Sequence, residues 1–446
     1  MDLTGDTVEL LQTLIRNACV NDGTPESGNE TRNADVLQSY VERPGVDIER
    51  WEPVPGRASF VARMPGTDPS AASLCLMGHT DVVPANPDGW SRDPFGGELV
   101  DGEVWGRGAV DMLNLTSSMA VVFRSLADRG FRPRGDLLYF AVADEEAGST
   151  YGARWVAREH TDAIRCDYVL TEHGGLHTGD EQRRSVTVNV GEKGVAWRRL
   201  RVRGTPGHGS MPFGADNALL TAAAIVSRLA EYRPAPRFHE LWRGQVEALG
   251  VPDDLKATLL DEHAVDEAIA GLEGRGVRAF LNACTHTTFS PNVVTTAGRP
   301  KTNVIPDVVD LDVDVRTMPG DESAEVEAHL RAALGDELFE RIEVEVLMDD
   351  PASMSRVGTP LWDALQRAVE EPFPGVRLTP QFTVGFTDSR VFRELGAVSY
   401  GAGLFSPALD SGEFGLRFHG NDERIDVESL QLTTELWERV VLDLMG

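Results

Sequence analysis

Long apolar runs, cysteine pairs and lysine are scarce in this sequence. No apolar run approaches the roughly 20 residues that span a bilayer, so a transmembrane segment is not expected. Residues 1–6 are polar and acidic and lack the basic-then-apolar layout of a signal peptide. We therefore expect a cytoplasmic protein that does not insert into a membrane.

Cysteine and positive charge are also limited. The four cysteines are scattered without a C-x-x-C pair, which disfavours a disulfide framework or a thiolate zinc site and predicts buried, reduced thiols. Only 42 lysines and arginines stand against 71 acidic residues, giving a formal net charge of −29. This excess of negative charge argues against nucleic acid or an anionic membrane surface as a partner.

The residues that are present predict a globular chain with more than one domain. There are 446 residues, of which 41% are hydrophobic and 25% charged. Short apolar runs that predict strands alternate with a helical pattern between them, as in a layered α/β domain covered on both faces. The predicted strands lie at 59–63, 73–78, 136–143 and 167–171.

The pattern changes near residue 190. Residues 186–190, 309–315 and 342–346 alternate apolar and polar side chains, which predicts a sheet with one face wet or lightly covered. Further elements are expected as helices at 217–229, 324–334, 360–369, 389–395 and 427–444, a helical stretch within 233–276, and a strand at 398–400. We predict an α/β domain formed by 1–192 and 351–446, interrupted by an inserted α+β domain at 193–350.

Imidazole and carboxylate groups follow three predicted strands. His79 and Asp81 follow the strand at 73–78, Glu145 and Glu146 follow the strand at 136–143, and Glu172 follows the strand at 167–171. Ligands of an open α/β sheet bind at the carboxyl ends of its strands. These side chains are therefore expected to meet at one edge.

Two further residues complete a metal-binding pattern. Asp111 ends a glycine-rich turn just before a helical pattern, and His419 lies far along the chain. Histidines and carboxylates without thiolates suit one or two zinc ions in a catalytic site. A metal pair needs a bridging carboxylate, terminal ligands and a base, and this set supplies them with one carboxylate to spare.

The motifs GHTDVV at 78–83, GRGAVDM at 106–112 and DEE at 144–146, together with His419, resemble the aminoacylase / carboxypeptidase G / succinyl-diaminopimelate desuccinylase family of dizinc hydrolases. The likeness runs from about residue 78 to about residue 426. It implies an α/β zinc-hydrolase domain with an inserted lid and dimerisation domain. The implied activity is cleavage of an amide bond, in a peptide or an N-acyl amino acid, by attack of a zinc-bridging hydroxide.

The resemblance also implies a role for each metal-site residue. His79 and Glu172 would hold one zinc ion, Glu146 and His419 the other, and Asp111 would bridge them.

Two supporting roles follow in the same way. Asp81 would orient His79 through its second ring nitrogen. Glu145 would be the general base that takes the proton of the attacking water and returns it to the leaving nitrogen. The peptide bond after Asp111 is expected to be cis, again on the family likeness.

The inserted domain resembles the family's lid. His208, in the motif GHGS at 207–210, matches the histidine that in dimeric members reaches the partner's active site and stabilises the oxyanion. Asn303 and Arg316 match lid positions that contact substrate, and a guanidinium suits a substrate carboxylate. The resemblance thus predicts a homodimer joined through the lid domain.

Several alternatives remain open from the residues alone. His173 and His177 lie close to Glu172 and compete with it as metal ligands. Arg316 shares the polar face of its strand with Asp312 and Asp314, so an ion-pair role competes with substrate binding. Asn303 could merely close the turn before Pro306.

The function also has alternatives. A non-catalytic, metal-dependent scaffold on the same fold would have no need of the base Glu145. An esterase would use the same chemistry, because such a site does not distinguish an amide from an ester. Cobalt or manganese could occupy the place of zinc.

Overall fold

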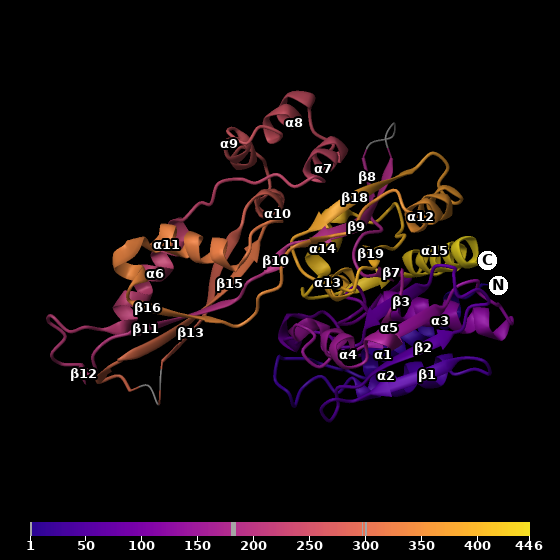
Figure 1. The fold of residues 1–446 in the computed structure, drawn as a ribbon, viewed down its shortest axis with the longest axis horizontal. Helices are drawn as coiled ribbons and strands as arrows, with labels where there is room; N and C mark the ends of the chain where they lie inside the picture. The colour runs from indigo at the N-terminus through magenta and orange to yellow at the C-terminus, as the bar shows by residue number, and fades with distance from the viewer. Residues whose placement is uncertain (1, 180–183, 297, 299–300) are drawn as a thin grey trace.

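The computed structural model describes residues 2–179, 184–296, 298 and 301–446. Two sheets lie in separate bodies, and the chain passes between them next to β9 (Ser185–Glu192) and β17 (Ser353–Met354) (Figure 1). The body with the larger sheet carries both termini. A cluster of short helices lies at the top of the view, between the two bodies.

The larger sheet has ten strands, and its centre is parallel. The order is β1-β2-β6-β3-β7-β19-β9-β17, with β8 and β18 also paired to β9. The remaining bounds are β1 (Asp47–Trp51), β2 (Ser59–Met64), β3 (Leu74–His79), β6 (Leu137–Val142), β7 (Tyr168–Thr171), β8 (His177–Thr178), β18 (Arg377–Thr383) and β19 (Val398–Gly401). Strands β6, β3, β7 and β19 run parallel, so their carboxyl ends share one edge.

Helices cover both faces of this sheet. Every residue of β3, β6 and β7 is buried, as the near-continuous apolar runs predicted. One face packs on α1 (Thr4–Arg16), α2 (Thr31–Val41), α3 (Leu113–Asp128), α12 (Pro360–Glu370) and α15 (Val427–Met445). The other packs on α4 (Ala153–Glu159), α5 (Thr161–Ile164) and α13 (Ser389–Glu394).

A small sheet joins distant parts of the chain beside the larger one. Strand β20 (Arg424–Asp426) pairs antiparallel with β5 (Glu103–Trp105), which pairs with β4 (Glu98–Val100). Helix α14 (Ser411–Arg417) precedes β20. The segment that carries His419 is therefore brought next to the segment that carries Asp111.

The second body is a five-stranded sheet with two helices. Its order is β10-β15-β11-β16, with β13 on the other side of β15. The bounds are β10 (Gly194–Val195), β11 (Arg198–Arg203), β13 (Thr288–Thr296), β15 (Val308–Thr317), β16 (Ile342–Val346), α6 (Ala218–Glu231) and α11 (Ser323–Phe339). The two helices cover one face, and β15 alternates buried and half-buried residues. At its far end, β12 (Gly207–His208) pairs with β14 (Val304–Ile305).

Three short helices lie in the stretch 233–276 that was predicted to be helical, and a fourth begins at its end and continues to residue 285. They are α7 (Trp242–Ala248), α8 (Asp253–Leu259), α9 (Val265–Ala270) and α10 (Arg275–Thr285). Their own core gathers around the buried Trp242 and includes Val246, Leu259 and Leu281. Helix α7 contacts β18, so this helical segment touches the larger sheet although it is inserted in the second body.

One expectation about the strands is wrong. The alternation at 186–190 predicted a half-covered strand, but all eight residues of β9 are buried. Thr187 and Asn189 are buried because β9 has strand neighbours on both sides and structure over both faces of the larger sheet. Cys19, Cys75 and Cys284 are buried, as predicted, whereas Cys166 is partly exposed. Within the described residues, no helix has the length and apolar character needed to cross a bilayer.

Candidate active site

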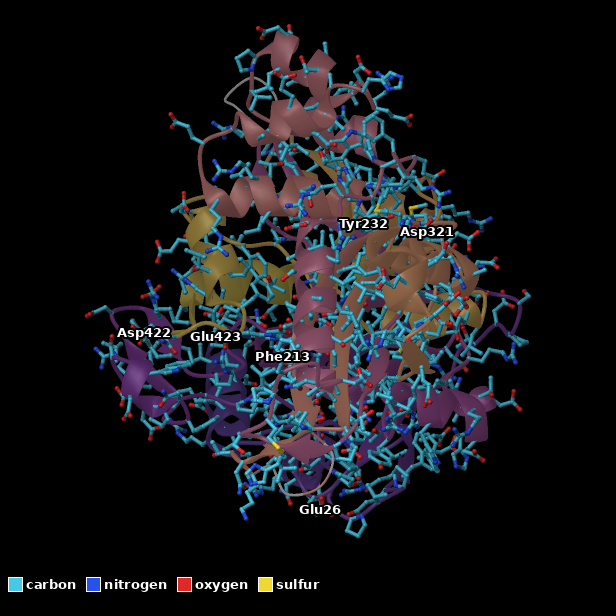
Figure 2. The ribbon with its side chains drawn as sticks, turned by 90° about the vertical axis from the view of Figure 1, so that its left-hand side faces the viewer. Glu26, Phe213, Tyr232, Asp321, Asp422 and Glu423 are labelled. Carbon is cyan, nitrogen blue, oxygen red and sulfur yellow. The ribbon has the colours of Figure 1, made fainter. Side chains whose placement is uncertain are left out.

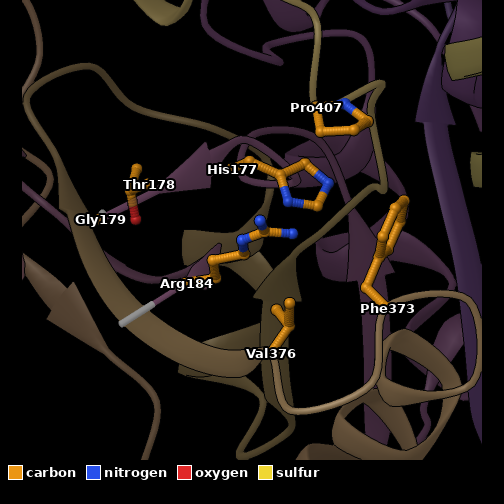
Figure 3. A pocket seen from close by; sticks show the side chains of 7 residues that line it. All are labelled: His177, Thr178, Gly179, Arg184, Phe373, Val376 and Pro407. Atoms are coloured by element: carbon orange, nitrogen blue, oxygen red, sulfur yellow. The ribbon is translucent and has the colours of Figure 1, made fainter. Parts of the chain in front are cut away.

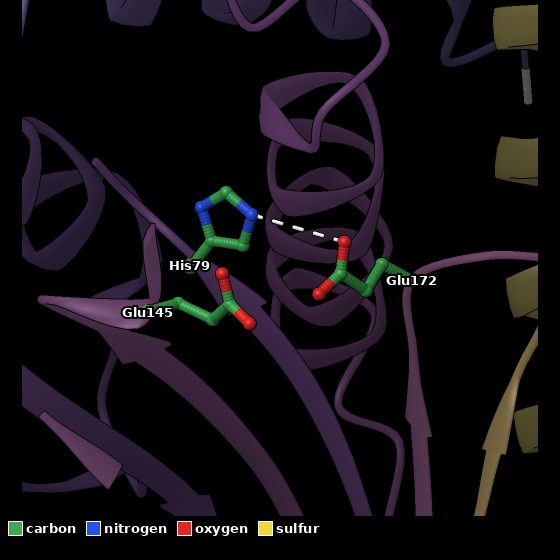
Figure 4. Close-up of side chains that lie close together, drawn as sticks. All are labelled: His79, Glu145 and Glu172. Carbon is green, nitrogen blue, oxygen red and sulfur yellow. Dashed lines mark ion pairs between the residues drawn. The ribbon is translucent and has the colours of Figure 1, made fainter. Parts of the chain in front are cut away.

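The three predicted strand ends meet at the carboxyl edge of the larger sheet. His79 is the last residue of β3, the turn of Glu145 and Glu146 follows β6, and Glu172 follows β7. Because β3 lies between β6 and β7, these groups come from neighbouring strands. Nitrogen or oxygen atoms of His79, Glu145 and Glu172 all lie within 4.8 Å of one another (Figure 4).

Asp111 lies between the two histidines. Its Oδ1 is 3.2 Å from Nε2 of His79, and its Oδ2 is 3.3 Å from Nε2 of His419. Glu146 places Oε2 at 3.2 Å from the same nitrogen of His419, and Glu172 places Oε2 at 3.8 Å from Nε2 of His79. Each histidine therefore has Asp111 on one side and a second carboxylate close by.

The turn that carries Asp111 precedes α3, and its peptide bond to Met112 is cis, as expected from the family likeness. All five residues proposed as metal ligands thus come together, although they lie between positions 79 and 419 of the chain. Glu145 is as close to His79 and Glu172 as a ligand would be, so distance alone does not separate its role from theirs.

Asp81 supports this edge in two ways. Its backbone carbonyl oxygen lies 3.0 Å from Nδ1 of His79, nearer than its carboxylate oxygen at 3.5 Å. The carboxylate accepts hydrogen bonds from the side-chain amide of Asn21 (2.9 Å) and from the backbone amides of Glu145 (3.3 Å) and Glu146 (3.1 Å). Asp81 therefore holds the Glu145–Glu146 turn as well as the ring of His79.

Burial and neighbouring charges shift the pKa values of the groups in the cluster. Burial raises the pKa of Glu145 and of Glu172 well above the usual range of a carboxyl. Burial opposes the ionisation of Asp111, but its contacts with His419 and His79 hold its pKa well below the usual value. Contacts with Asp111 and Glu146 raise the pKa of His419 to about 10. This edge thus strongly favours positive charge.

A cavity of about 530 Å³ opens over this cluster. Beyond the cluster, its apolar lining comes from both bodies and from the helical segment: Trp197, Phe280, Val384, Phe386 and Phe418. Arg316 also lines the cavity, 5.0 Å from the ring centre of Phe386. An apolar cavity with a few converging polar groups is the usual form of a small-molecule site.

Arg316 forms an ion pair, one of the two roles that the sequence left open, and it also lines the cavity. Nε and Nη2 donate to the carboxylate of Asp314 at 2.8 and 3.2 Å. Its remaining nitrogen, Nη1, is buried and has no hydrogen-bond partner among the described residues. The competing Asp312 is instead paired with Arg199 at 2.7 Å.

The other two lid candidates lie elsewhere. His208 is exposed on β12, and its Nδ1 lies 2.7 Å from Oγ of Ser210. Asn303 accepts a hydrogen bond from the amide of Gly209 through its backbone carbonyl (2.9 Å). Neither residue lines the cavity over the cluster, and β12 lies at the far end of the second body (Figure 1).

Comparison with known proteins assigns most of the chain to one family. The family model described as peptidase family M20/M25/M40 matches residues 75–443. The chain belongs to this family. It is a hydrolase that acts on amide bonds, which sets aside the non-catalytic scaffold.

Curated M20 relatives cover most of the chain. The human N-fatty-acyl-amino acid synthase/hydrolase PM20D1 is 30% identical over 387 residues, which are 84% of this chain and 74% of that protein. The succinyl-diaminopimelate desuccinylase of Cereibacter sphaeroides is 27% identical over 98% of both chains. Aminoacylase-1 of Sus scrofa is 31% identical over 58% of this chain and 60% of its own.

Solved structures show the same fold. The M20 metallo-carboxypeptidase Sso-CP2 of Sulfolobus solfataricus superposes with a TM-score of 0.73 at 17% identity, covering 99% of this chain and 98% of its own. Human carnosine dipeptidase 1 reaches 0.71 at 17% identity, over 99% and 97%. The Bacillus subtilis YXEP protein, described as a dinuclear metal-binding peptidase, reaches 0.58 at 14% identity over 98% of both.

The M20 site residues fit divalent metal ions. Oε1 of Glu145 and Oε1 of Glu146 are buried without a hydrogen-bond partner in the described part of the chain. Buried carboxylate oxygens of this kind are costly unless a cation or a donor faces them. The donor set of imidazoles and carboxylates, with no thiolate, suits a divalent metal ion such as zinc, cobalt or manganese.

The two competing histidines are separated by the fold. His173 lines the cavity, with Nε2 3.7 Å from the carboxylate of Glu172, and its ring packs on Phe418. His177 faces a different cavity, where its ring meets the edge of Phe373 with a centroid distance of 4.7 Å (Figure 3). Only His173 is therefore near enough to compete with Glu172.

Sequence reasoning missed the residues behind the ligands. Asn21 donates to the carboxylates of Asp81 and Asp144, and Arg57 donates to the side-chain oxygen of Asn21. On the opposite side, Glu423 accepts from the backbone of Asp111. The available signal was weak, because a single acidic residue four positions after His419 has no distinctive spacing.

Proposed function

We propose that this M20 hydrolase is a dizinc enzyme that cleaves the amide bond of a peptide or an N-acyl amino acid. The observation that carries the proposal is the position of Asp111 between His79 and His419, with Glu172 and Glu146 beside them. This arrangement offers two adjacent binding positions that share one carboxylate.

In this proposal His79 and Glu172 would hold one zinc ion, Glu146 and His419 would hold the other, and Asp111 would serve both. Cobalt or manganese would accept the same donors. When bound, the metal pair supplies Lewis acidity that polarises the amide carbonyl and lowers the pKa of water.

Glu145 acts as the general base. It takes a proton from the attacking water and returns it to the nitrogen of the leaving group. Its Oε1 supports this role, because that oxygen is buried beside the cluster and free of hydrogen bonds among the described residues.

Arg316 and the aromatic walls bind the substrate. The free Nη1 of Arg316 is available to a substrate carboxylate, and Trp197 and Phe386 flank the guanidinium. The relatives are named for fatty-acyl, succinyl and other N-acyl amino acids as well as dipeptides. An N-acyl amino acid would place its carboxylate at Arg316 and its acyl group along the aromatic walls. An ester of the same shape remains the alternative substrate.

We also propose that residues 1–192 and 351–446 form the catalytic domain, and that 193–350 is a lid through which two subunits dimerise. Apolar side chains at the far end of the lid support this, since Phe213 is fully exposed (Figure 2) and Leu220 and Val294 are at least half-exposed. His208 lies at that end and would serve the partner subunit's site together with Asn303. The free cysteines favour a reducing compartment such as the cytoplasm.

A hydrolysis screen tests the proposal. The zinc-loaded enzyme is given N-acetyl, N-succinyl and N-fatty-acyl amino acids, dipeptides and the matching esters, with the metal-depleted chain as control. We expect metal-dependent release of free amine from at least one amide class. Cleavage of esters alone would replace the proposal with an esterase, and activity that survives complete metal removal would end it.

A further inference from the structure

A buried ion pair lies behind the cluster and does not touch the cavity. Nη1 of Arg107 is 2.8 Å from Oε2 of Glu423, although the two residues are 316 positions apart. Their side chains are 3% and 0% exposed. Arg107 follows β5 and Glu423 precedes β20. The pair therefore lies just beyond the end of the β5–β20 pairing, next to the segments that carry Asp111 and His419.

The carboxylate of Glu423 holds the backbone of the Asp111 turn. Its Oε1 accepts hydrogen bonds from the amides of Val110 (2.7 Å) and Asp111 (3.1 Å). A carboxylate that accepts two consecutive backbone amides fixes the orientation of that peptide segment. The side chain of Asp111 therefore leaves the backbone at a position that Glu423 sets.

The guanidinium of Arg107 holds the backbone at His419. Nη2 donates to the carbonyl oxygen of His419 at 3.3 Å, and the guanidinium also lies 5.3 Å from the ring centre of Trp90. His419 has a φ of +55°, in the left-handed region that non-glycine residues disfavour. A tertiary contact to this carbonyl stabilises that conformation and hence the direction of the imidazole.

His79, in the other half of the cluster, has a support of its own, which also holds the turn of Glu146. His79 contacts Asp81, and Asp81 is held by Asn21 and by the Glu145–Glu146 turn. In the part of the chain that the structure describes, neither Arg107 nor Glu423 has a hydrogen bond to these supports.

We propose that the Arg107–Glu423 pair is a positioning device that sets the spacing between Asp111 and His419. Because Asp111 would serve both metal ions and His419 only one, the pair supports the metal ion of Glu146 and His419 more than that of His79 and Glu172. This inference rests on the proposed dizinc function. It predicts that a substitution in the pair weakens the binding of one metal ion more than that of the other. A general loss of stability would weaken both equally.

The test is a metal titration of the full-length, metal-depleted chain. Zn²⁺ binding is followed in competition with a chromogenic chelator, and Co²⁺ binding by visible absorption. The variants are Glu423→Gln, which removes the charge that Arg107 faces, and Arg107→Lys, which keeps the charge but loses the two-pronged contact. Asp422→Asn is the matched control, because it lies in the same loop (Figure 2) and bonds only to Ser91 and Arg424 among the described residues. His419→Ala marks the binding step of its own metal.

We expect the wild type and Asp422→Asn to bind two ions. Glu423→Gln should weaken the step marked by His419→Ala by about 10- to 100-fold and leave the other step within about twofold, with an altered Co²⁺ spectrum. Arg107→Lys should weaken the same step by a smaller factor. If Glu423→Gln fails to fold, as judged by circular dichroism, Arg107→Lys decides.

Two unchanged steps, or equal weakening of both, would overturn the inference while leaving the dizinc proposal in place. A wild type that binds fewer than two ions would overturn the proposed function and this inference together.

Discussion

The carboxyl edge of the larger sheet and the far end of the second body hold their candidate residues very differently. At the sheet edge, His79, Asp111 and Glu145 are buried, and each contacts a residue that is distant along the chain. At the far end, His208 is exposed and its described side-chain contacts are with Ser210, two positions along the chain. The first region is preorganised, whereas the second is not.

This difference assigns different roles to the two regions. A preorganised cluster at the end of a parallel sheet can bind metal and activate water without help from the lid. An exposed histidine beside exposed apolar side chains gains a defined environment only when another surface covers it. In the proposed lid-mediated dimer, the partner subunit would supply that surface.

Removing the metal should have the largest effect on activity and stability, and it should act through the sheet edge and not through the far end of the second body. Chelation should abolish hydrolysis and lower the melting temperature, because the buried carboxylates then repel one another. Restoring Zn²⁺ at about 100 times its dissociation constant should raise the free energy of unfolding by roughly 2.7 kcal/mol. Calorimetry with and without Zn²⁺ measures this, and a His419→Ala variant should respond less. An unchanged melting temperature would contradict a metal site at this edge.

Replacing Glu145 should give the next largest effect. Glu145→Gln keeps the size of the side chain but removes the base, so kcat should fall by about 10²- to 10⁴-fold while two metal ions remain bound. Steady-state kinetics and metal analysis check the two parts separately.

Glu146→Gln is the matched comparison, because it lies one residue along the same turn and should lose metal. If Glu145→Gln also loses metal, Glu145 is a ligand and the base must be sought elsewhere. Full activity in Glu145→Gln would reject the base assignment outright.

The far end of the lid makes a smaller but more specific prediction. His208→Ala and Glu145→Ala should each be inactive alone. A mixture that exchanges subunits should recover about a quarter of wild-type activity, because half of the dimers are mixed and each holds one intact composite site. Sedimentation verifies the dimer, and tagged subunits verify the exchange. Proven exchange without recovery would show that His208 does not act across the interface.

The site was largely predictable from the sequence, since parallel strands bring residues at their ends together. His79, Glu146 and Glu172 each follow a buried apolar run, and that position alone predicted their meeting. The partners of Asp111 were not predictable in this way. Glu423 reaches it through the pairing of β20 with β5, a long-range contact that leaves no periodic pattern. Strand β9 was misjudged for a related reason, because alternation reports polarity and not which sheet the strand joins.

A smaller effect should come from replacing Lys193, which lies where the chain passes between the two bodies. Lys193 directly follows β9, and its ammonium donates to the carbonyl oxygens of Ala283 (2.9 Å) and His286 (2.5 Å) at the end of α10. Burial lowers its pKa to about 7, because neutral carbonyls compensate a buried charge only in part. The histidines of the sheet edge have carboxylates beside them, whereas Lys193 has no carboxylate bonded to it in the described chain.

The sign of the pH effect follows from this pKa. The usual value is 10.5, so between about pH 7 and pH 10.5 the unfolded chain binds more protons at Lys193 than the folded chain does. The contribution of Lys193 to the free energy of unfolding therefore rises with pH across that window. Lys193→Met removes the titration but keeps an apolar chain of similar length. The melting temperature of the wild type, relative to Lys193→Met, should increase by a few degrees between about pH 7 and pH 9.5. Cys284 nearby does not interfere, because burial raises its pKa to about 12. Parallel pH profiles of the two proteins would mean that Lys193 keeps an ordinary pKa, and that the junction between the two bodies is wetter than its burial indicates.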